Sequence, residues 1–497
     1  MNFILSLSLI IWMSSRSKIV FFINNKRQEV SDRQCFQTLA EFLRYEVGLP
    51  GTKVVCAEGD CGACTALLGS FHDAEGGKLK YKSVNTCILP LFSMDACHLI
   101  TVEGLRKGQE LHPVQKAMVD NFGAQCGYCT PGFICSMAAM VENAVLKRKT
   151  KISEKTARNY LTGNLCRCTG YQPILKAAES LDLKTMETLR DRYHNDDRIS
   201  EMKSLASQPV HIKGSNFELH LPVTIEEAVK IKGQNQKTKI IAGSTDSGVL
   251  VNKGKEDYIS VLSLMHISSL YEIKKESGYL QIGARVTLSS LLNVVETEIP
   301  ELGKMLNVFA SPQIKNQATL IGNMMNASPI ADTIPFLMAN DAEKELQSIN
   351  GKRWVPIADI FQGYKNLKVN ADEIATSIRI RIPSKNTFVR LFKVARRKDL
   401  DISAITFAAE VEVNGNKIEK ARVALGGVGP TPLRMKEIEK KLNGAEIEKS
   451  VFENVSADLL NLIKPLSDVR GSDDYRLQLC QNLFLKFYNE LSQGQTP

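Results

Sequence analysis

The stretch Cys56-Ala-Glu-Gly-Asp-Cys61-Gly-Ala-Cys64-Thr, with Cys87 further along the chain, decides how the first part of this protein folds. Three thiolates on one loop enclose a small metal centre from one side, and a fourth from a neighbouring strand closes it. Gly59 and Gly62 allow the loop to turn tightly and to aim backbone N–H groups at the sulfurs. The stretch therefore predicts a metal centre with four ligands: Cys56, Cys61, Cys64 and Cys87.

The spacing C-x4-C-x2-C followed by a distant cysteine is the plant-type [2Fe-2S] pattern. Structural zinc is the alternative, although zinc sites usually pair two CxxC-like knuckles. Upstream, two apolar runs around Asn24-Asn25 predict a β-hairpin within residues 18–30, and a helix is expected from Thr38 to about Tyr45. The loop is thus expected within a small domain of strands and helix.

A second cysteine group consists of the pair Cys126 and Cys129 and the pair Cys166 and Cys168. Helices are predicted over residues 134–147 and 153–161, so each pair is expected at a helix end or in a loop. Helix N-termini stabilise the negative charge of a thiolate-bound cluster. The pattern favours a second iron–sulfur cluster, while CxxC combined with CxC is also compatible with zinc.

Length, charge and hydropathy limit the number of domains and the kinds of partner that are expected. A chain of 497 residues is too long for one hydrophobic core and predicts three or four domains. The net charge of +9 comes without a dense Lys/Arg run, so no nucleic-acid partner is expected. No apolar run reaches the roughly 20 residues that cross a bilayer, so no membrane association is expected.

The cysteine content and the N-terminus indicate a cytoplasmic location. The twelve cysteines come without an export signal, which argues for metal ligation rather than disulfides. Met1 to Trp12 is apolar but lacks a basic region and a cleavage site, so translation from Met13 is favoured over a secretory signal. The remaining cysteines are expected to be small buried apolar side chains: Cys35, Cys97, Cys135 and Cys480.

Two later stretches have the character of nucleotide-binding loops. Lys239-Ile-Ile-Ala-Gly-Ser-Thr-Asp-Ser-Gly248 is a short apolar strand that runs into a small-residue loop. Because Gly243 and Gly248 lack side chains, such a loop can bring backbone N–H groups against a pyrophosphate, although a plain turn is the commoner reading. The stretch lacks GxGxxG, which argues against a Rossmann site. In the second stretch, 313–332, the Asp332 carboxylate can accept from sugar hydroxyls.

The two cysteine groups resemble, in order and spacing, the iron–sulfur region of the xanthine dehydrogenase and aldehyde oxidase family. The residues around the second group carry much of the resemblance: Gln125-Cys-Gly-Tyr-Cys-Thr-Pro-Gly132 and Leu161-Thr-Gly-Asn-Leu-Cys-Arg-Cys-Thr-Gly-Tyr171. The two later stretches resemble the FAD-binding domain of the same family, and residues 423–434 and 468–476 resemble its closing domain. One departure is Val55, where the family usually has glycine before the first ligand. That change removes no ligand.

The resemblance implies a multidomain α+β fold. Its expected parts are an N-terminal extension (1–16), a β-grasp 2Fe-2S ferredoxin domain (17–101), a four-helix 2Fe-2S domain (102–180), a linker (181–208), a vanillyl-alcohol-oxidase-type FAD-binding domain (209–386) and a C-terminal α+β flavoprotein domain (387–497).

The resemblance also assigns site residues. It implies that the eight cysteines above hold two [2Fe-2S] clusters, and that FAD contacts Ile240, Ile241, Ala242, Gly243, Ser244, Thr245, Asp246 and Ser247 at the pyrophosphate, Phe309 and Lys393 near the flavin, and Thr319, Gly322, Asn323 and Asp332 elsewhere. From its position alone, Lys393 is equally well a surface cation. No side chain is expected to act as a catalytic acid or base.

In this family, purines or aldehydes are oxidised at a molybdopterin centre held by a large domain or separate subunit, a region absent from this sequence. The resemblance therefore implies the iron–sulfur and FAD subunit of a split xanthine dehydrogenase, with a large molybdenum-pterin subunit as its partner in a heterotetramer of two heterodimers. Electrons from hypoxanthine or xanthine would pass through the helical-domain cluster, the ferredoxin-like cluster and FAD to NAD+. The alternatives are the corresponding subunit of an aldehyde or heteroaromatic hydroxylase, and a stand-alone redox carrier.

Overall fold

The computed structural model describes residues 15–494, apart from the side chains of residues 73–75, and these residues form two compact units. Unit 1 contains the chain up to residue 268 together with 311–318, and unit 2 contains 269–310 and the chain from 319 onwards. The predicted start at Met13 and nearly all of the extension 1–16 lie outside the described residues. Within residues 15–494, no helix has both the length and the apolar character to cross a membrane.

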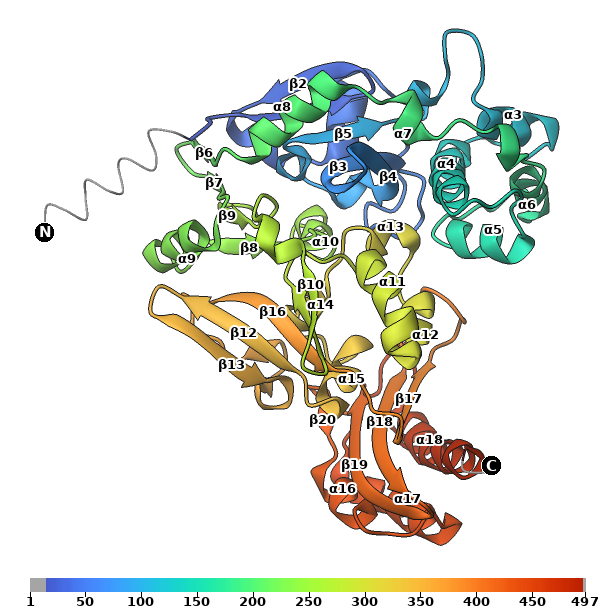
Figure 1. Cartoon of the computed structure of the whole chain (residues 1–497), viewed down its shortest axis with the longest axis vertical. Coiled ribbons are helices and arrows are strands. Elements are labelled where there is room, and N and C mark those ends of the chain that lie inside the picture. The colour runs from blue at the N-terminus through green and yellow to red at the C-terminus, as the bar shows by residue number, and fades with distance from the viewer. Residues whose placement is uncertain (1–14, 495–497) are drawn as a thin grey trace, which may run out of the picture. The chain divides into compact units, whose positions relative to one another are not determined.

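Unit 1 begins with a five-stranded sheet in the order β2-β1-β5-β3-β4 (Figure 1). Its strands are β1 (Ile19–Ile23), β2 (Lys26–Val30), β3 (Thr65–Glu75), β4 (Lys78–Asn85) and β5 (Cys97–Ile100). The predicted hairpin is confirmed, because β1 and β2 pair around a turn in which Asn24 has a positive φ of 55°. The predicted helix is also confirmed as α2 (Leu39–Glu41) and the π-helical turn Phe42–Glu46, which begin at a capping box between Thr38 and Glu41.

Four helices follow, as the family resemblance implies. They are α3 (Pro113–Asp120), α4 (Thr130–Leu146), α5 (Glu154–Leu161) and α6 (Gln172–Glu179). Helix α4 starts directly after Cys129, with Pro131 in its first turn, where proline costs no hydrogen bond. Helix α5 is capped by the hydroxyl of Ser153. The cysteine pairs therefore flank helices, as their spacing indicates.

The segment 181–208, expected as a linker, is folded. It contains the 3-10 turn Leu183–Thr185 and the helices α7 (Leu189–Arg192) and α8 (Asp196–Ala206). The buried Glu142 carboxylate on α4 accepts hydrogen bonds from the backbone N–H groups of Leu189, at 2.6 Å, and Arg190, at 3.1 Å. The polar composition that suggests a linker comes from N-cap residues and from the exposed faces of short helices.

The rest of unit 1 contains a second, four-stranded sheet in the order β6-β7-β9-β8, in which β9 runs parallel to both neighbours. Its strands are β6 (Val210–Lys213), β7 (Glu218–Leu221), β8 (Lys239–Ile241) and β9 (Ser260–Ser263). The accompanying helices are α9 (Ile225–Gln234), α10 (Ser247–Asn252) and α13 (Pro312–Lys315). Helix α13 comes from the separate segment 311–318 that belongs to this unit.

Unit 2 contains a five-stranded sheet in the order β10-β11-β16-β12-β13. Its strands are β10 (Ile273–Glu276), β11 (Tyr279–Gly283), β12 (Glu343–Ser348), β13 (Gly351–Pro356) and β16 (Ile374–Arg381), with a small ribbon of β14 (Phe361–Gly363) and β15 (Asn366–Leu367). The helices of this part are α11 (Leu288–Glu298), α12 (Pro300–Val308), α14 (Leu320–Met325) and α15 (Thr333–Ala339).

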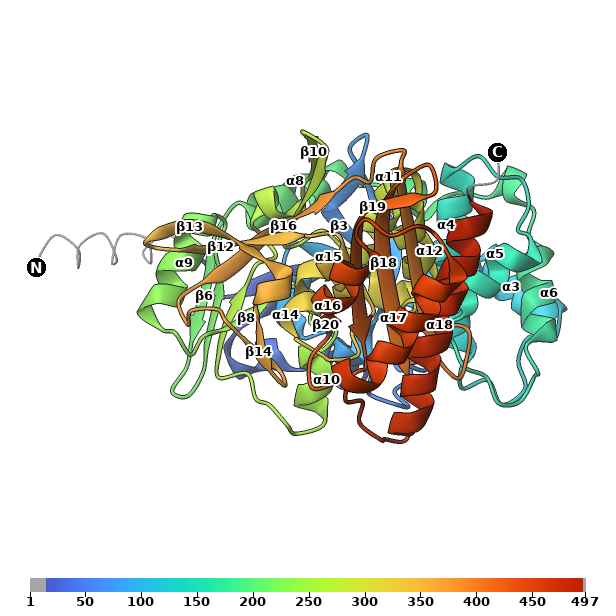
Figure 2. The same cartoon turned by 90° about the horizontal axis from the view of Figure 1, so that it is seen from below.

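The C-terminal part of unit 2 consists of another β-sheet and the helices that pack against it. The strands β17 (Thr387–Val394), β18 (Ile405–Asn414), β19 (Lys417–Gly426) and β20 (Leu433–Arg434) form its sheet, and the helices are α16 (Lys436–Leu442), α17 (Lys449–Leu462) and α18 (Asp473–Gln493). Figure 2 shows α17 and α18 side by side. Phe407 on β18 contacts Phe484 and Phe487 on α18, which joins the sheet to the helices through a shared apolar core.

Candidate metal centres and flavin-binding loops

The first cysteine group converges in the loop that precedes β3. The thiols of Cys61 and Cys87 hydrogen-bond to Cys56, and the backbone N–H groups of Glu58 and Cys61 lie 3.4 Å from Cys56 Sγ. These hydrogen bonds lower the pKa of Cys56 below its usual range. Cys64, which is buried, hydrogen-bonds to Cys87 in turn. Four gathered sulfurs with backbone N–H groups aimed at one of them fit a [2Fe-2S] cluster.

The backbone of this loop depends on its glycines. Gly59 and Gly62 have positive φ angles of 75° and 68°, as the sequence predicts. A Cβ atom on Gly62 would overlap the carbonyl oxygen of Gly163, which belongs to the segment of the second cysteine group. Val55, the departure from the family pattern, has 61% of its surface exposed, so its side chain points to solvent rather than into the loop.

The second cysteine group also comes together. The sulfurs of Cys126 and Cys168 lie 3.5 Å apart, and the thiols of Cys129 and Cys166 form a second hydrogen-bonded pair. Burial raises the pKa of Cys129 to about 12. Cys126 and Cys168 are exposed, whereas Cys129 and Cys166 are half-buried. Two adjoining thiol pairs, one of them ending at the N-terminus of the 17-residue helix α4, also fit a [2Fe-2S] cluster.

The four other cysteines are buried, as expected: Cys35, Cys97, Cys135 and Cys480.

The two cysteine groups are joined by hydrogen bonds around a residue that the sequence does not single out. Leu165 donates its N–H to the carbonyl of Cys61 at 2.9 Å. Gln313 on α13 is 1% exposed, and its Nε2 donates to Asn164 at 2.9 Å, Ser136 at 3.1 Å and Thr65 at 3.3 Å. Nothing in the local pattern around Gln313 indicates this role, because its partners are far away in the sequence.

The stretch 240–247 runs from the end of β8, through residues 242–246, to the first residue of α10. In the sequence, Gly243 and Gly248 are compatible with a close approach of pyrophosphate and equally with a plain turn. In the structure, a Cβ atom on Gly243 would overlap the carbonyl of Gln317, and one on Gly248 would overlap the carbonyl of Ile88. These glycines are therefore required because protein backbone passes close to them.

Helix α10 is attached directly to the first cysteine loop. Asn252 Nδ2 donates to the carbonyls of Cys87, at 2.7 Å, and Ala57, at 2.8 Å. Lys253 and Glu58 form an ion pair at 2.9 Å. Within unit 1, the proposed pyrophosphate loop and the first cysteine group are thus neighbours, joined by one short helix.

In unit 2, the predicted FAD contacts lie at the C-terminal end of α12, in and before α14, before α15 and on β17. Phe309 follows α12 and is half-buried, and Thr319 caps α14 by accepting from the N–H of Gly322 at 3.0 Å. Gly322 is exposed. Asn323 Oδ1 accepts from the hydroxyl of Thr333 at 2.6 Å.

Asp332 and Lys393 are partners. Lys393 Nζ lies 2.5 Å from Asp332 Oδ2, and the hydroxyls of Ser403 and Thr406 donate to Asp332 Oδ1 at 2.5 and 2.7 Å. Both side chains are buried, with 6% and 4% exposure for lysine and aspartate respectively. Lys393 is therefore not a surface cation, and the Asp332 carboxylate accepts hydrogen bonds from three protein donors.

Comparison with known proteins identifies three domains. Residues 101–179 match a [2Fe-2S] binding domain, residues 215–384 the FAD binding domain in molybdopterin dehydrogenase, and residues 390–491 a CO dehydrogenase flavoprotein C-terminal domain. Over 95% of this chain, the xanthine dehydrogenases of Emericella nidulans and Blastobotrys adeninivorans are 28% and 30% identical to it. The chain is homologous to the xanthine dehydrogenase family. This confirms the resemblance inferred from the cysteine motifs.

The chain spans about two fifths of these xanthine dehydrogenases, 38% and 40% of their lengths. Two solved structures resemble part of it, each with a TM-score of 0.52 and 26% identity. Quinoline 2-oxidoreductase from Pseudomonas putida 86 matches 57% of this chain and 99% of its own, and the reconstituted CO dehydrogenase from Oligotropha carboxidovorans matches 55% and 96%. The multidomain α+β fold with iron–sulfur, FAD-binding and C-terminal flavoprotein domains is thereby confirmed.

Proposed function

We propose that this chain is the electron-transfer subunit of a xanthine dehydrogenase and holds two [2Fe-2S] clusters and one FAD. The observation that carries the proposal is the occurrence of two groups of four converging cysteines in a chain that also has an FAD-binding domain. When bound, the clusters carry single electrons and the flavin exchanges them for the two-electron chemistry of NAD+.

The residues of the chain hold and insulate these groups. The cysteine thiolates would be the cluster ligands. The residues proposed to contact FAD are 240–247, Phe309, Thr319, Gly322, Asn323, Asp332 and Lys393. Asp332 and Lys393 support that site through their buried ion pair. Within unit 1, Gln313 and Asn252 hold the segments that carry the two cysteine groups through hydrogen bonds. No acid or base catalysis by a side chain is required.

The proposed partner is a large molybdenum-pterin subunit, in a heterotetramer of two heterodimers, and the proposed acceptor is NAD+. Support comes from the xanthine dehydrogenase relatives and from the family model, which is described for molybdopterin dehydrogenases. Substrate oxidation would take place on the partner, and this chain would receive the electrons.

Iron analysis of single-cysteine variants tests the two clusters. Cys129→Ala should halve the iron content of the purified chain, whereas Cys135→Ala, six residues further along the same segment, should leave it unchanged because Cys135 is a buried core residue. For the first group, Cys87→Ala and Cys97→Ala form the matching pair. Colourless, iron-free protein that is still active would contradict both clusters and support zinc.

An activity assay of the chain together with its proposed partner tests which substrate the enzyme oxidises. The chain, purified together with the large subunit, should form NADH when xanthine is added. Failure with every purine but activity with an aldehyde or a heteroaromatic compound would refute the xanthine assignment and keep the redox one. A chain that exchanges electrons with NADH but never associates with a molybdenum protein would instead be a stand-alone carrier.

One observation favours a second candidate. Quinoline 2-oxidoreductase, which is named for a heteroaromatic substrate, has a chain that this protein matches over 99% of that chain's length at 26% identity. The second proposal is therefore the electron-transfer subunit of a heteroaromatic hydroxylase. Turnover of quinoline but not of xanthine by the assembled enzyme would select it.

A further inference from the structure

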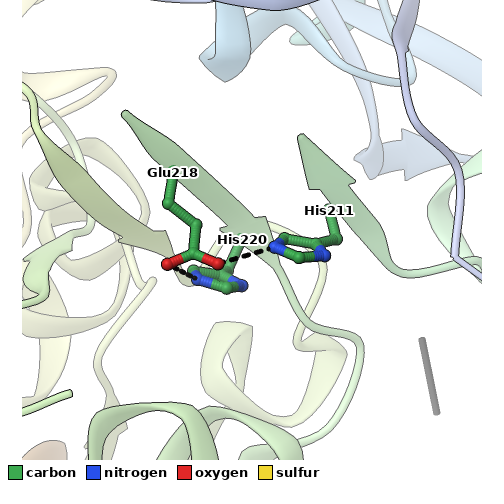
Figure 3. A group of neighbouring side chains, drawn as sticks. All are labelled: His211, Glu218 and His220. Atoms are coloured by element: carbon green, nitrogen blue, oxygen red, sulfur yellow. Dashed lines mark hydrogen bonds and ion pairs between the residues drawn. The ribbon is translucent and has the colours of Figure 1, made fainter. Parts of the chain in front are cut away.

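Three side chains on the β6–β7 hairpin, remote in sequence from all the cysteines, form a group of their own. His211 on β6 lies directly opposite His220 on β7, and Glu218 precedes His220 by two positions (Figure 3). Because side chains alternate along a strand and cross-strand partners share a face, all three project from the same face of the hairpin. One potential ligand atom from each lies within 4.8 Å of the other two.

The carboxylate of Glu218 is the point on which the two imidazoles converge. Its Oε1 lies 2.9 Å from His211 Nε2, and its Oε2 lies 3.5 Å from His220 Nε2. Lys213, on the same face of β6, places its Nζ 3.5 Å from Oε1. The imidazole rings are stacked, with centroids 4.7 Å apart and planes only 8° from parallel.

We propose that His211, Glu218 and His220 form a binding site for a divalent transition-metal ion, with zinc as the best match. Two imidazole nitrogens and one carboxylate oxygen are an established zinc donor set, and a water molecule completes the tetrahedron. His211 and Glu218 keep 18% and 24% of their side-chain surface exposed, which gives the ion and its water access. The buried ring of His220 forms the floor of the site.

Binding requires a small, definable rearrangement. In a tetrahedral zinc site with ligand distances of about 2.0–2.1 Å, neighbouring ligand atoms lie about 3.4 Å apart, so the present group must contract. Since the rings are nearly parallel, one imidazole must also rotate for both Nε2 lone pairs to meet at one ion. The ion would replace the hydrogen bonds of Glu218 and displace Lys213. It would join β6, the edge strand of this sheet, to β7.

Zinc titration of the cofactor-loaded protein, in competition with a chromophoric chelator, tests the site. The wild-type chain should bind one zinc ion more than the His211→Ala/His220→Ala variant, with the iron and flavin contents of the two proteins equal. His194→Ala is the matched control, because His194 also has a carboxylate neighbour, Asp196 at 3.3 Å, but belongs to no group of three potential ligands within residues 15–494. It should keep the extra zinc.

Two further measurements keep the outcome decisive. Glu218→Gln preserves the shape of the hairpin but removes the anionic oxygen, and should weaken zinc binding at least tenfold even if the double variant fails to fold. Zinc X-ray absorption should show nitrogen and oxygen ligands. Sulfur ligands, equal zinc binding by wild type and Glu218→Gln, or no binding at millimolar zinc would each overturn the proposal. Iron and flavin contents report separately on the proposed function.

Discussion

Asn252 Nδ2 donates to the carbonyl oxygen of Cys87 at 2.7 Å, so a side chain of α10 holds the peptide group of a predicted cluster ligand. The same nitrogen donates to Ala57, the residue after another predicted ligand. The positive end of this amide dipole lies beside the loop that would surround the cluster. Such a dipole favours the more negative, reduced state of a cluster.

Asn252→Leu should lower the reduction potential of the first cluster, because it keeps the side-chain volume but removes both hydrogen bonds. It should also cost about 1–3 kcal/mol of stability, since two carbonyls lose a donor. Potentiometric titration followed by electron paramagnetic resonance measures the first effect and thermal unfolding the second. Asn235→Leu, at an exposed position, serves as the control. An unchanged potential would refute the electrostatic role of Asn252.

Gln313→Ala should destabilise unit 1 by about 1–3 kcal/mol, because Thr65, Ser136 and Asn164 lose a buried donor. Gln313→Glu should be worse, since a carboxylate cannot donate to the three oxygens and would be a buried charge. Urea denaturation measures both effects. Gln236→Ala, at an exposed position, should have no effect. Equal stability of all variants would show that the hydrogen bonds of Gln313 contribute nothing.

Lys393→Met should lower the stability of unit 2 by about 3–5 kcal/mol, because the buried Asp332 carboxylate loses its cation. The double variant Lys393→Met/Asp332→Asn should recover part of the loss, and Lys398→Met, at an exposed lysine, should cause none. Thermal unfolding and flavin content are measured together. Loss of flavin with unchanged stability would assign Lys393 to the flavin alone and contradict the structural role.

Glu142→Gln should change how stability depends on pH. Burial raises the pKa of Glu142 from 4.5 to about 7, even though two backbone N–H groups stabilise its charge. Between these values the folded chain binds a proton that the unfolded chain has released, so this residue makes stability fall as pH rises, by at most about 1.4 kcal/mol per pH unit.

Thermal unfolding at about pH 4 and about pH 7.5 brackets this window. The Gln variant should lose this contribution, whereas Glu179→Gln, at an exposed glutamate, should keep the wild-type dependence. An identical pH profile for wild type and Glu142→Gln would contradict the raised pKa.

Local sequence patterns predict the features that depend on neighbours in the chain. The loop that carries Cys56, Cys61 and Cys64 and the turn at Asn24-Asn25 are of this kind, because the dihedral angles of a few consecutive residues determine their conformation. The partnership of Asp332 with Lys393 is not, since 61 positions separate the two residues. The three acceptors of Gln313 are between 149 and 248 positions away, and no periodicity encodes such contacts.

Two other features also depend on partners that are distant in the sequence. The local pattern marks Gly243 and Gly248 as places of close approach, and in the structure protein backbone from residues distant in sequence passes close to both. Residues 181–208 have the composition of a linker, yet the carboxylate of Glu142 on another helix fixes two of their N–H groups. In both cases the local sequence pattern does not identify the distant residue that makes the contact.

The assignment of residues 311–318 to unit 1 has a consequence for biosynthesis. These residues follow 269–310, which belong to unit 2, so a ribosome must pass residue 318 before unit 1 has all of its parts. Until then, the oxygens of Thr65, Ser136 and Asn164 lack the hydrogen bonds that the amide of Gln313 donates to them. For the same reason, a gene divided anywhere between codons 268 and 311 would deprive the first unit of its own helix.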